Sequence, residues 1–348
     1  MATYLVTGIA GFIGSALGRA LLRRGHEARG LDNFVTGKRR NLEEIIQHID
    51  LREADLLDHN AVSDACRGVD FVLHQAAIAS VPRSIKDPVE CNAANVLGTL
   101  NLLVAARDAG VQRFIYASSS SLYGDTLTLP TREDTPANPI SPYAVSKLAG
   151  ELYAISFYRS YGLRTVALRY FNVFGPRQDP SSPYSGVLSI FISRMLAGER
   201  PTIFGDGDTS RDFTFVQNVV EANLLACTAP ADLVAGRAFN IATGRRITLH
   251  QMFASVKRLT GYSGETAYGP ERAGDIKHSC GAISLAAQCL GYAPKFSFEE
   301  GLAQTVSWYM RECPRTRGLA QHHCLSLGAT SPPTLRGLPV PAAAWRRH

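Results

Sequence analysis

The fold is decided near the N-terminus by Tyr4-Leu5-Val6-Thr7-Gly8-Ile9-Ala10-Gly11-Phe12-Ile13-Gly14, where a short apolar run meets a segment with apolar residues at helical spacing. The run predicts a buried strand, and the following segment predicts a helix. Gly8 permits a tight turn, Gly11 lets backbone N–H groups approach a pyrophosphate, and Gly14 lets the helix pack closely on the strand. The spacing T-G-x-x-G-x-x-G is one residue longer than the standard G-x-G-x-x-G. The stretch predicts a dinucleotide-binding turn.

Short apolar runs continue to alternate with helical patterns beyond this turn. We expect an α/β fold, a doubly wound parallel sheet of the Rossmann type with right-handed crossovers. Further strands are expected at 28–31, 71–73, 114–116 and 165–168, and helices at 94–109 and 142–161.

The pattern changes after Asn172, where two clusters of turn residues, 175–186 and 205–208, separate shorter helices. These helices are expected at 187–196, 219–227 and 249–259. We interpret this region as a second, smaller α/β lobe, the substrate lobe. The two lobes should be interleaved, because Phe239-Asn240-Ile241 is expected to return to the main sheet. The expected division is 1–174 plus 217–243 for the first lobe and 175–216 plus 244–312 for the second.

Composition predicts a soluble globular protein, since 45% of the 348 residues are hydrophobic and 19% are charged. No apolar run long enough to span a membrane and no signal peptide are evident, so we expect a cytoplasmic protein with no membrane partner. The net charge is +6, but residues 313–348 hold five arginines and no acidic residue. Residues 1–312 therefore carry 31 basic and 30 acidic side chains and are nearly neutral. We therefore expect no nucleic-acid partner and predict that 313–348 is a disordered basic tail.

The seven cysteines form no C-x-x-C pair and no cluster with histidine at metal-ligand spacing. The sequence predicts buried thiols in a reducing compartment, with no disulfide and no metal site.

Asp32 lies 18 residues after Gly14, at the end of the second expected strand. A carboxylate there can accept both ribose hydroxyls of an adenosine half and would repel a 2′-phosphate, so NAD is favoured over NADP. The basic run Lys38-Arg39-Arg40 leaves the alternative of a phosphate-binding patch open.

A second motif begins at Ser141-Pro142, which predicts a helix start with serine as N-cap and proline at the first helical position. Tyr143 and Lys147 then lie one turn apart on one face. Tyrosine has a pKa near 10, so action as a base near pH 7 requires a pKa lower by roughly 3 units. The lysine ammonium, the positive nicotinamide ring and the helix N-terminus are all expected to lower it.

Four motifs together resemble the extended short-chain dehydrogenase/reductase family, the NAD-dependent epimerases and dehydratases: T-G-x-x-G-F-I-G, His74-Gln75-Ala76-Ala77, the serines before Tyr123-Gly124-Asp125, and Tyr143-Ala144-Val145-Ser146-Lys147. The resemblance covers residues 2 to about 312. It implies catalysis by Ser119, Tyr143 and Lys147, with Ser119 hydrogen-bonding the sugar hydroxyl that Tyr143 deprotonates. It implies an NAD site formed by Gly8, Gly11, Phe12, Ile13, Gly14, Asp32, Asn33, Asp55, Leu56, Gln75, Ala76, Ala77, Tyr143, Lys147 and Tyr170.

Within the family, dehydratases carry Thr-Asp-Glu where this chain has Ser119-Ser120-Ser121, and serines cannot supply that acid and base, so dehydration is disfavoured. The segments 168–175, 205–213 and 272–275 resemble UDP-sugar 4-epimerases. The likeness implies that the UDP-sugar is bound by Ser119, Tyr143, Asn172, Val187, Arg211, Arg272, Asp275 and Ser279.

Ser279 stands where members restricted to glucose and galactose forms can carry a bulky tyrosine, and a small residue leaves room for an N-acetyl group. The flanking residues look most like UDP-N-acetylglucosamine 4-epimerases, with one departure at Gly281-Ala282-Ile283, where Ala-Asp-Ile is common.

The expected activity is reversible 4-epimerisation of UDP-GlcNAc/UDP-GalNAc, UDP-Glc/UDP-Gal or both, through a 4-keto intermediate with tightly bound NAD. Three alternatives stay open: a UDP-glucuronate decarboxylase, another NAD-dependent nucleotide-sugar oxidoreductase, and an NAD-binding regulator with a silent site. By likeness to the family, the helices at 94–109 and 142–161 should form a four-helix contact in a homodimer.

Overall fold

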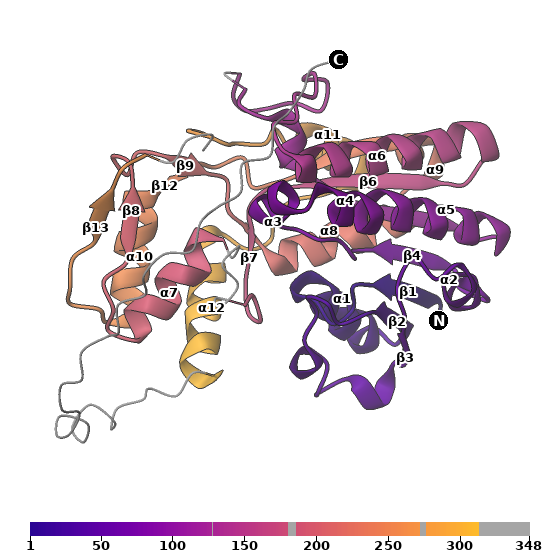
Figure 1. The fold of residues 1–348 in the computed structure, drawn as a ribbon, viewed down its shortest axis with the longest axis horizontal. Coiled ribbons are helices and arrows are strands. Elements are labelled where there is room, and N and C mark those ends of the chain that lie inside the picture. The colour runs from indigo at the N-terminus through magenta and orange to yellow at the C-terminus, as the bar shows by residue number, and fades with distance from the viewer. Residues whose placement is uncertain (127, 180–185, 272–275, 313–348) are drawn as a thin grey trace, which may run out of the picture. The chain divides into compact units, whose positions relative to one another are not determined.

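A seven-stranded parallel sheet forms the centre of the protein, as seen in the computed structural model, which describes residues 1–126, 128–179, 186–271 and 276–312 (Figure 1). Its spatial order is β11-β6-β5-β4-β1-β2-β3, so the direction of strand addition reverses between β1 and β4. The strands are β1 (Thr3–Thr7), β2 (Glu27–Asp32), β3 (Asp50–Glu53), β4 (Phe71–His74), β5 (Arg113–Ser119), β6 (Thr165–Tyr170) and β11 (Arg237–Ile241). The predicted doubly wound sheet is confirmed, including the return of 239–241 to its edge.

Helices cover both faces of this sheet, because side chains alternate along each strand. Tyr4 and Val6 of β1 point into one apolar cluster and Leu5 points into the other. The first cluster is covered by α1 (Phe12–Arg23), α8 (Val216–Thr228) and α11 (Ser284–Leu290). The second is covered by α2 (His59–Cys66), α5 (Gly98–Asp108) and α6 (Pro142–Tyr161). The bounds of α6 are those predicted from the sequence.

A second set of elements belongs to the same compact unit, Met1–Pro314, and is built around its own apolar cluster. Three two-stranded pairs lie here, β7 (Val173–Phe174) with β10 (Thr214–Phe215), β9 (Ser210–Arg211) with β12 (Ile247–Thr248), and β8 (Thr202–Phe204) with β13 (Ala267–Gly269). The helices are α7 (Val187–Leu196), α10 (Leu249–Thr260) and α12 (Phe298–Glu312), with a short α9 (Ala231–Val234) beside the main sheet. The predicted helices at 187–196 and 249–259 are confirmed; the division into two lobes stays a prediction, and the tail 313–348 lies outside the described residues.

The segment Pro88–Asp108 is helical throughout, combining α4 (Pro88–Asn92), a π-helix (Ala93–Leu97) and α5, and it follows a short α3 (Val81–Lys86). By length and mean hydropathy this segment could span a membrane, which the search for continuous apolar runs did not reveal. Its residues pack on α2 and α6, and 44% of the apolar window is buried, as in a core helix of a folded domain.

A buried polar chain connects the sheet to this helical segment. His74, at the end of β4, is 1% exposed, and its ring lies 2.7 Å from Thr7 Oγ1 through Nδ1 and 2.8 Å from Thr99 Oγ1 through Nε2. Thr99 donates to the carbonyl of Asn95, so its oxygen must accept from Nε2–H of a neutral imidazole. Burial, together with the smaller effect of the positive charge of Lys147, lowers the pKa of His74 to about 3.

Because buried His74 stays neutral, the stability of the folded protein should decrease as the pH falls. An unfolded histidine takes up a proton below a pKa of about 6.5, whereas His74 stays neutral down to about 3, so folding loses free energy as pH falls through that window. When the pH falls from 7 to 5, the burial of neutral His74 should by itself lower the free energy of unfolding by about 2 kcal/mol. Urea denaturation at both pH values should show a smaller loss for His74→Gln; an equal loss would contradict the assignment.

Candidate functional site

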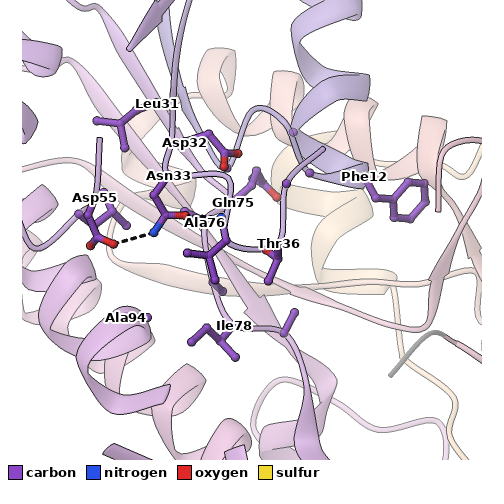
Figure 2. Close-up of a pocket in the computed structure, with 18 of the residues that line it drawn as sticks. Phe12, Leu31, Asp32, Asn33, Thr36, Asp55, Gln75, Ala76, Ile78 and Ala94 are labelled. Carbon is purple, nitrogen blue, oxygen red and sulfur yellow. Dashed lines mark hydrogen bonds between the residues drawn. The ribbon is translucent and has the colours of Figure 1, made fainter. Parts of the chain in front are cut away.

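A cavity of about 400 Å³ opens at the carboxyl ends of β1, β2, β3 and β4, where the strand order reverses (Figure 2). Parallel α/β sheets bind ligands at such a point. Most predicted cofactor residues line it together: Gly8, Gly11, Phe12, Ile13, Gly14, Asp32, Asn33, Asp55, Leu56, Gln75, Ala76 and Ala77.

The turn between β1 and α1 tolerates only glycine at two of its positions. Gly8 has φ +68°, and a Cβ there would lie 2.8 Å from the backbone of Ala76. A Cβ on Gly14 would lie 2.0 Å from the carbonyl oxygen of Gly8, so the first turn of α1 rests directly on the end of β1. No side chain caps the N-terminus of α1, which leaves its first amide groups for an anion in the cavity.

Asp32 is held in place at the cavity wall by two backbone amides. Ala10 N–H and Phe34 N–H donate to its carboxylate at 2.9 and 2.8 Å, and burial raises its pKa. A Cβ on Gly37 would lie 2.7 Å from the same carboxylate, so a glycine lets the chain turn past it. Beside it, Asn33 donates to Asp55 at 2.6 Å (Figure 2), which ties the ends of β2 and β3 together. These residues fit an adenosine ribose.

The basic run Lys38-Arg39-Arg40, for which a phosphate-binding patch was the alternative, has acidic neighbours in the structure. Lys38 and Arg40 contact Asp179, and Arg39 contacts Glu53. Ion pairing of all three cations argues against a dedicated site for a 2′-phosphate and agrees with Asp32 at the ribose end.

Gln75 connects the cavity to the core beneath it. Tyr170 donates to Gln75 Oε1 at 3.2 Å, and Asn223 of α8 donates to the Tyr170 hydroxyl at 2.8 Å. Burial raises the pKa of Tyr170 to about 12. Tyr170 does not line the cavity, so among the predicted cofactor residues it supports Gln75 from below.

The predicted catalytic motif begins α6 as expected. The Ser141 side chain accepts from Ala144 N–H at 3.2 Å, Pro142 occupies the first turn, and Tyr143 N–H donates to Ser84 at 3.0 Å. Tyr143 and Lys147 follow on one helical face, and Lys147 is 4% exposed with Nζ 4.9 Å from the ring centre of Tyr116.

Ser119 ends β5 opposite this turn, and its side chain lies close enough to Tyr143 to lower the pKa of that hydroxyl. The end of β5 is fixed against α6 by a buried group of charges, in which Ser118 donates to Glu151 at 2.6 Å and Arg169 of β6 pairs with Glu151 at 2.6 Å. Glu151 lies one turn beyond Lys147, so this contact sets the register between the helix and the strand that carry the three residues.

The pKa of Tyr143 differs from the expectation. Burial raises it, and the hydrogen bond with Ser119 lowers it, so the surrounding protein groups do not produce the lowered value inferred from the sequence. The sequence argument counted nearby charges and omitted desolvation, which acts on the phenolate as well. Burial also lowers the pKa of Lys147 to about 8.

A second cavity of about 270 Å³ is lined by three of the predicted substrate residues, Asn172, Val187 and Arg211. Arg211 donates from Nη1 to the carbonyl oxygens of Ser210 at 3.0 Å and Lys277 at 3.3 Å. Asn172 has φ +28°, and its amide donates to the Asp212 carbonyl at 3.2 Å.

Asp212 joins three segments below this cavity. Its fully buried carboxylate accepts from the backbone N–H groups of Thr243, Gly244 and Gly281, and from the Thr243 hydroxyl at 2.6 Å. Burial raises the pKa of Asp212, and these four donors oppose that rise. The strand that carries Arg211 is therefore rigidly seated.

Ser279 N–H donates to the Ser210 carbonyl at 3.1 Å, which places Ser279 beside the strand of Arg211. Arg272 and Asp275, the other two predicted substrate residues, lie outside the described residues. The roles of all these residues stay predictions.

Sequence reasoning missed several residues that line the two cavities. In the first these include Thr36, Gly37, Asn41, Ala94, Arg177 and Asp179, and in the second Gln178, Phe204, Thr209 and Leu249. Gly37 could have been noticed as a glycine closely following Asp32. Arg177 and Asp179 carry no local signal, because only the tertiary fold brings their segment to the β1–α1 turn.

Comparisons with known proteins agree with this arrangement. Residues 4–242 match the model of the NAD dependent epimerase/dehydratase family. The chain is similar to a UDP-glucose 4-epimerase from Thermotoga maritima solved with UDP-glucose, at 39% identity and TM-score 0.85, covering 89% of this chain and 99% of that one. It is similar to a UDP-N-acetylglucosamine 4-epimerase from Methanobrevibacter ruminantium solved with UDP-N-acetylmuramic acid, at 38% identity, TM-score 0.85 and the same coverages.

A third similar structure is a UDP-glucose 4-epimerase from Thermus thermophilus solved with NAD, at 39% identity and TM-score 0.80, covering 88% of this chain and 98% of that one. The chain belongs to the NAD dependent epimerase/dehydratase family.

Proposed function

We propose that this protein interconverts UDP-sugars that differ in configuration at C4, with NAD held in the cavity at the β1–α1 turn. The observation that carries the proposal is the placement of Tyr143 and Lys147 on one face of α6, with Ser119 beside Tyr143 at the end of β5. The similar epimerases support the choice of reaction. UDP-N-acetylhexosamines are the proposed preferred substrates, because Ser279 is small.

The chemistry that NAD supplies when bound is reversible acceptance of a hydride from C4 of the sugar. Tyr143 takes the proton of the 4-hydroxyl and returns it, while Ser119 hydrogen-bonds the same oxygen. With a pKa of about 8, Lys147 is mostly protonated at pH 7, and its positive charge favours the Tyr143 phenolate.

The UDP half would be held in the second cavity, where the guanidinium of Arg211 suits a diphosphate. Binding energy concentrated on UDP leaves the sugar free to turn about its diphosphate as a 4-keto form and present its other face. Addition of a hydride to that other face would invert the configuration at C4.

The test of this reaction is product analysis by NMR and mass spectrometry with UDP-GlcNAc, UDP-Glc and UDP-glucuronate. An epimerase gives products of unchanged mass and no net use of NAD. Loss of mass from UDP-glucuronate would identify a decarboxylase, net cofactor consumption would identify a reductase, and no turnover of any substrate would favour a regulator.

Tyr143→Phe should lower turnover at least a hundredfold, because general-base catalysis typically contributes about 10²–10⁴-fold. NAD should stay bound, since Tyr143 does not line the cavity that holds most predicted cofactor residues. Steady-state rates and cofactor content measured on the same preparation check both parts. Turnover within tenfold of the parent would show that Tyr143 is not the base.

Ser279→Tyr should lower kcat/KM for UDP-GlcNAc at least tenfold, roughly 1.4 kcal/mol, and change that for UDP-Glc much less. The added ring would occupy the space proposed for the N-acetyl group, and overpacking of a filled site typically costs about 1–3 kcal/mol. Equal losses on both substrates would remove the physical support for the N-acetylhexosamine assignment.

A homodimer is proposed from an apolar surface formed by α4, the π-helix and α6, which lie side by side (Figure 1). Val89, Leu97, Val145 and Leu152 on this surface are 46–77% exposed. Exposed apolar side chains gathered on packed helices suit a four-helix contact between two copies.

Leu152→Glu should convert this dimer to a monomer at micromolar concentration, because it buries a charge at the proposed contact. Leu233→Glu, at a 41% exposed leucine of α9, is the matched control and should stay dimeric. Light scattering distinguishes the two states. A monomeric parent protein would contradict the proposal.

A further inference from the structure

We propose that two ion pairs, Lys38–Asp179 and Arg177–Glu44, form a clasp across the cofactor cavity and slow the release of NAD. The inference rests on the proposed function in one respect, the placement of NAD in the cavity at the β1–α1 turn.

The first pair joins two segments at the wall of this cavity. Lys38 follows β2 and Asp179 follows β7, and both residues line the cavity wall. Arg40 lies 3.8 Å from the same carboxylate of Asp179. Asp179 is 24% exposed and Lys38 is 36% exposed, so the contact is partly withdrawn from water.

The second pair fastens the same segment to α1. Arg177 donates to Glu44 at 2.8 Å, and Glu44 accepts from Arg19 of α1 at 3.0 Å. Arg19 is itself seated by bonds to the carbonyl oxygens of Ser15 and Asn41, at 3.0 and 2.6 Å. The carboxylate of Glu44 is thus a bridge between the helix that begins at the glycine turn and the segment across the cavity.

The segment 177–179 is also held from its other side. Tyr309 of α12 donates to the carbonyl of Gln178, and the guanidinium of Arg177 lies 6.0 Å from the Trp308 ring centre. It is therefore anchored on α12 and reaches the cavity through its charged side chains. Lys38, Arg177 and Asp179 of the clasp therefore all lie at the wall of the cavity proposed for the dinucleotide.

The sign of one substitution separates a clasp from a simple charge effect. Asp179 places a carboxylate at the wall of a cavity that takes an anionic pyrophosphate. If Asp179 acted only through its charge, Asp179→Asn would relieve repulsion, free Lys38 for the anion and slow NAD release. If Asp179 closes the clasp, the same change speeds release. The two expectations have opposite signs.

The experiment measures release of NADH from the loaded full-length protein, by the fluorescence change during a chase with excess NAD. Asp179→Asn and Arg177→Gln should each release cofactor about two- to fivefold faster than the parent, the range expected for one partly exposed ion pair. Glu53→Gln is the matched control, because it removes one carboxylate from the pair between Glu53 of β3 and Arg39, the neighbour of Lys38, without touching the clasp. Its release should equal the parent's.

Melting temperatures of all variants should stay close to that of the parent, which separates loss of the clasp from unfolding. Release that is unchanged or slower in Asp179→Asn would overturn the clasp and leave the proposed function standing. A parent protein that binds no NAD would contradict the proposed function itself.

Discussion

The whole arrangement depends on how closely α1 approaches the end of β1. With Gly14 directly over the carbonyl of Gly8, the helix has no room for a side chain, and its uncapped N-terminus lies at the mouth of the cavity. This contact is made at the reversal of strand order, so the residues after β1, β2, β3 and β4 all converge there. Two glycines thereby determine where an anionic cofactor can be bound.

Those parts of the structure that are set by local chemistry could be predicted from the sequence. The bounds of α6 follow from Ser141 as N-cap, Pro142 in the first turn and Gly162 in the left-handed conformation after the last. Six of the seven strands of the main sheet could be read from short apolar runs, because a strand buried on both faces carries apolar residues at nearly every position. The edge strand β3, Asp50–Glu53, was missed, because its residues are mostly polar and exposed. Gly8, Gly11, Gly14 and Asp32 followed from the same elements, whereas the other predicted cavity residues followed from the family resemblance.

Other features could not be predicted, because they depend on contacts distant in sequence. The three two-stranded pairs beyond β6 are too short to give a period-2 pattern, and their partners lie far along the chain. The pKa of Tyr143 depends on burial, which a list of nearby charges does not reveal. The pairing of Glu151 with Arg169 joins a helix to a strand whose sequences separately suggest only solvated charges.

Asp212 has a consequence for the order in which the two cavities can form. Every donor to its carboxylate comes from residues 243–281, whereas the cofactor cavity is lined by residues 8–94 together with 177 and 179. Contacts between distant residues form late in folding, because closing a long loop costs entropy before any contact is gained. During synthesis most residues that line the dinucleotide cavity are therefore made before the residues that hold the strand of Arg211, so the second cavity is the later of the two to be completed.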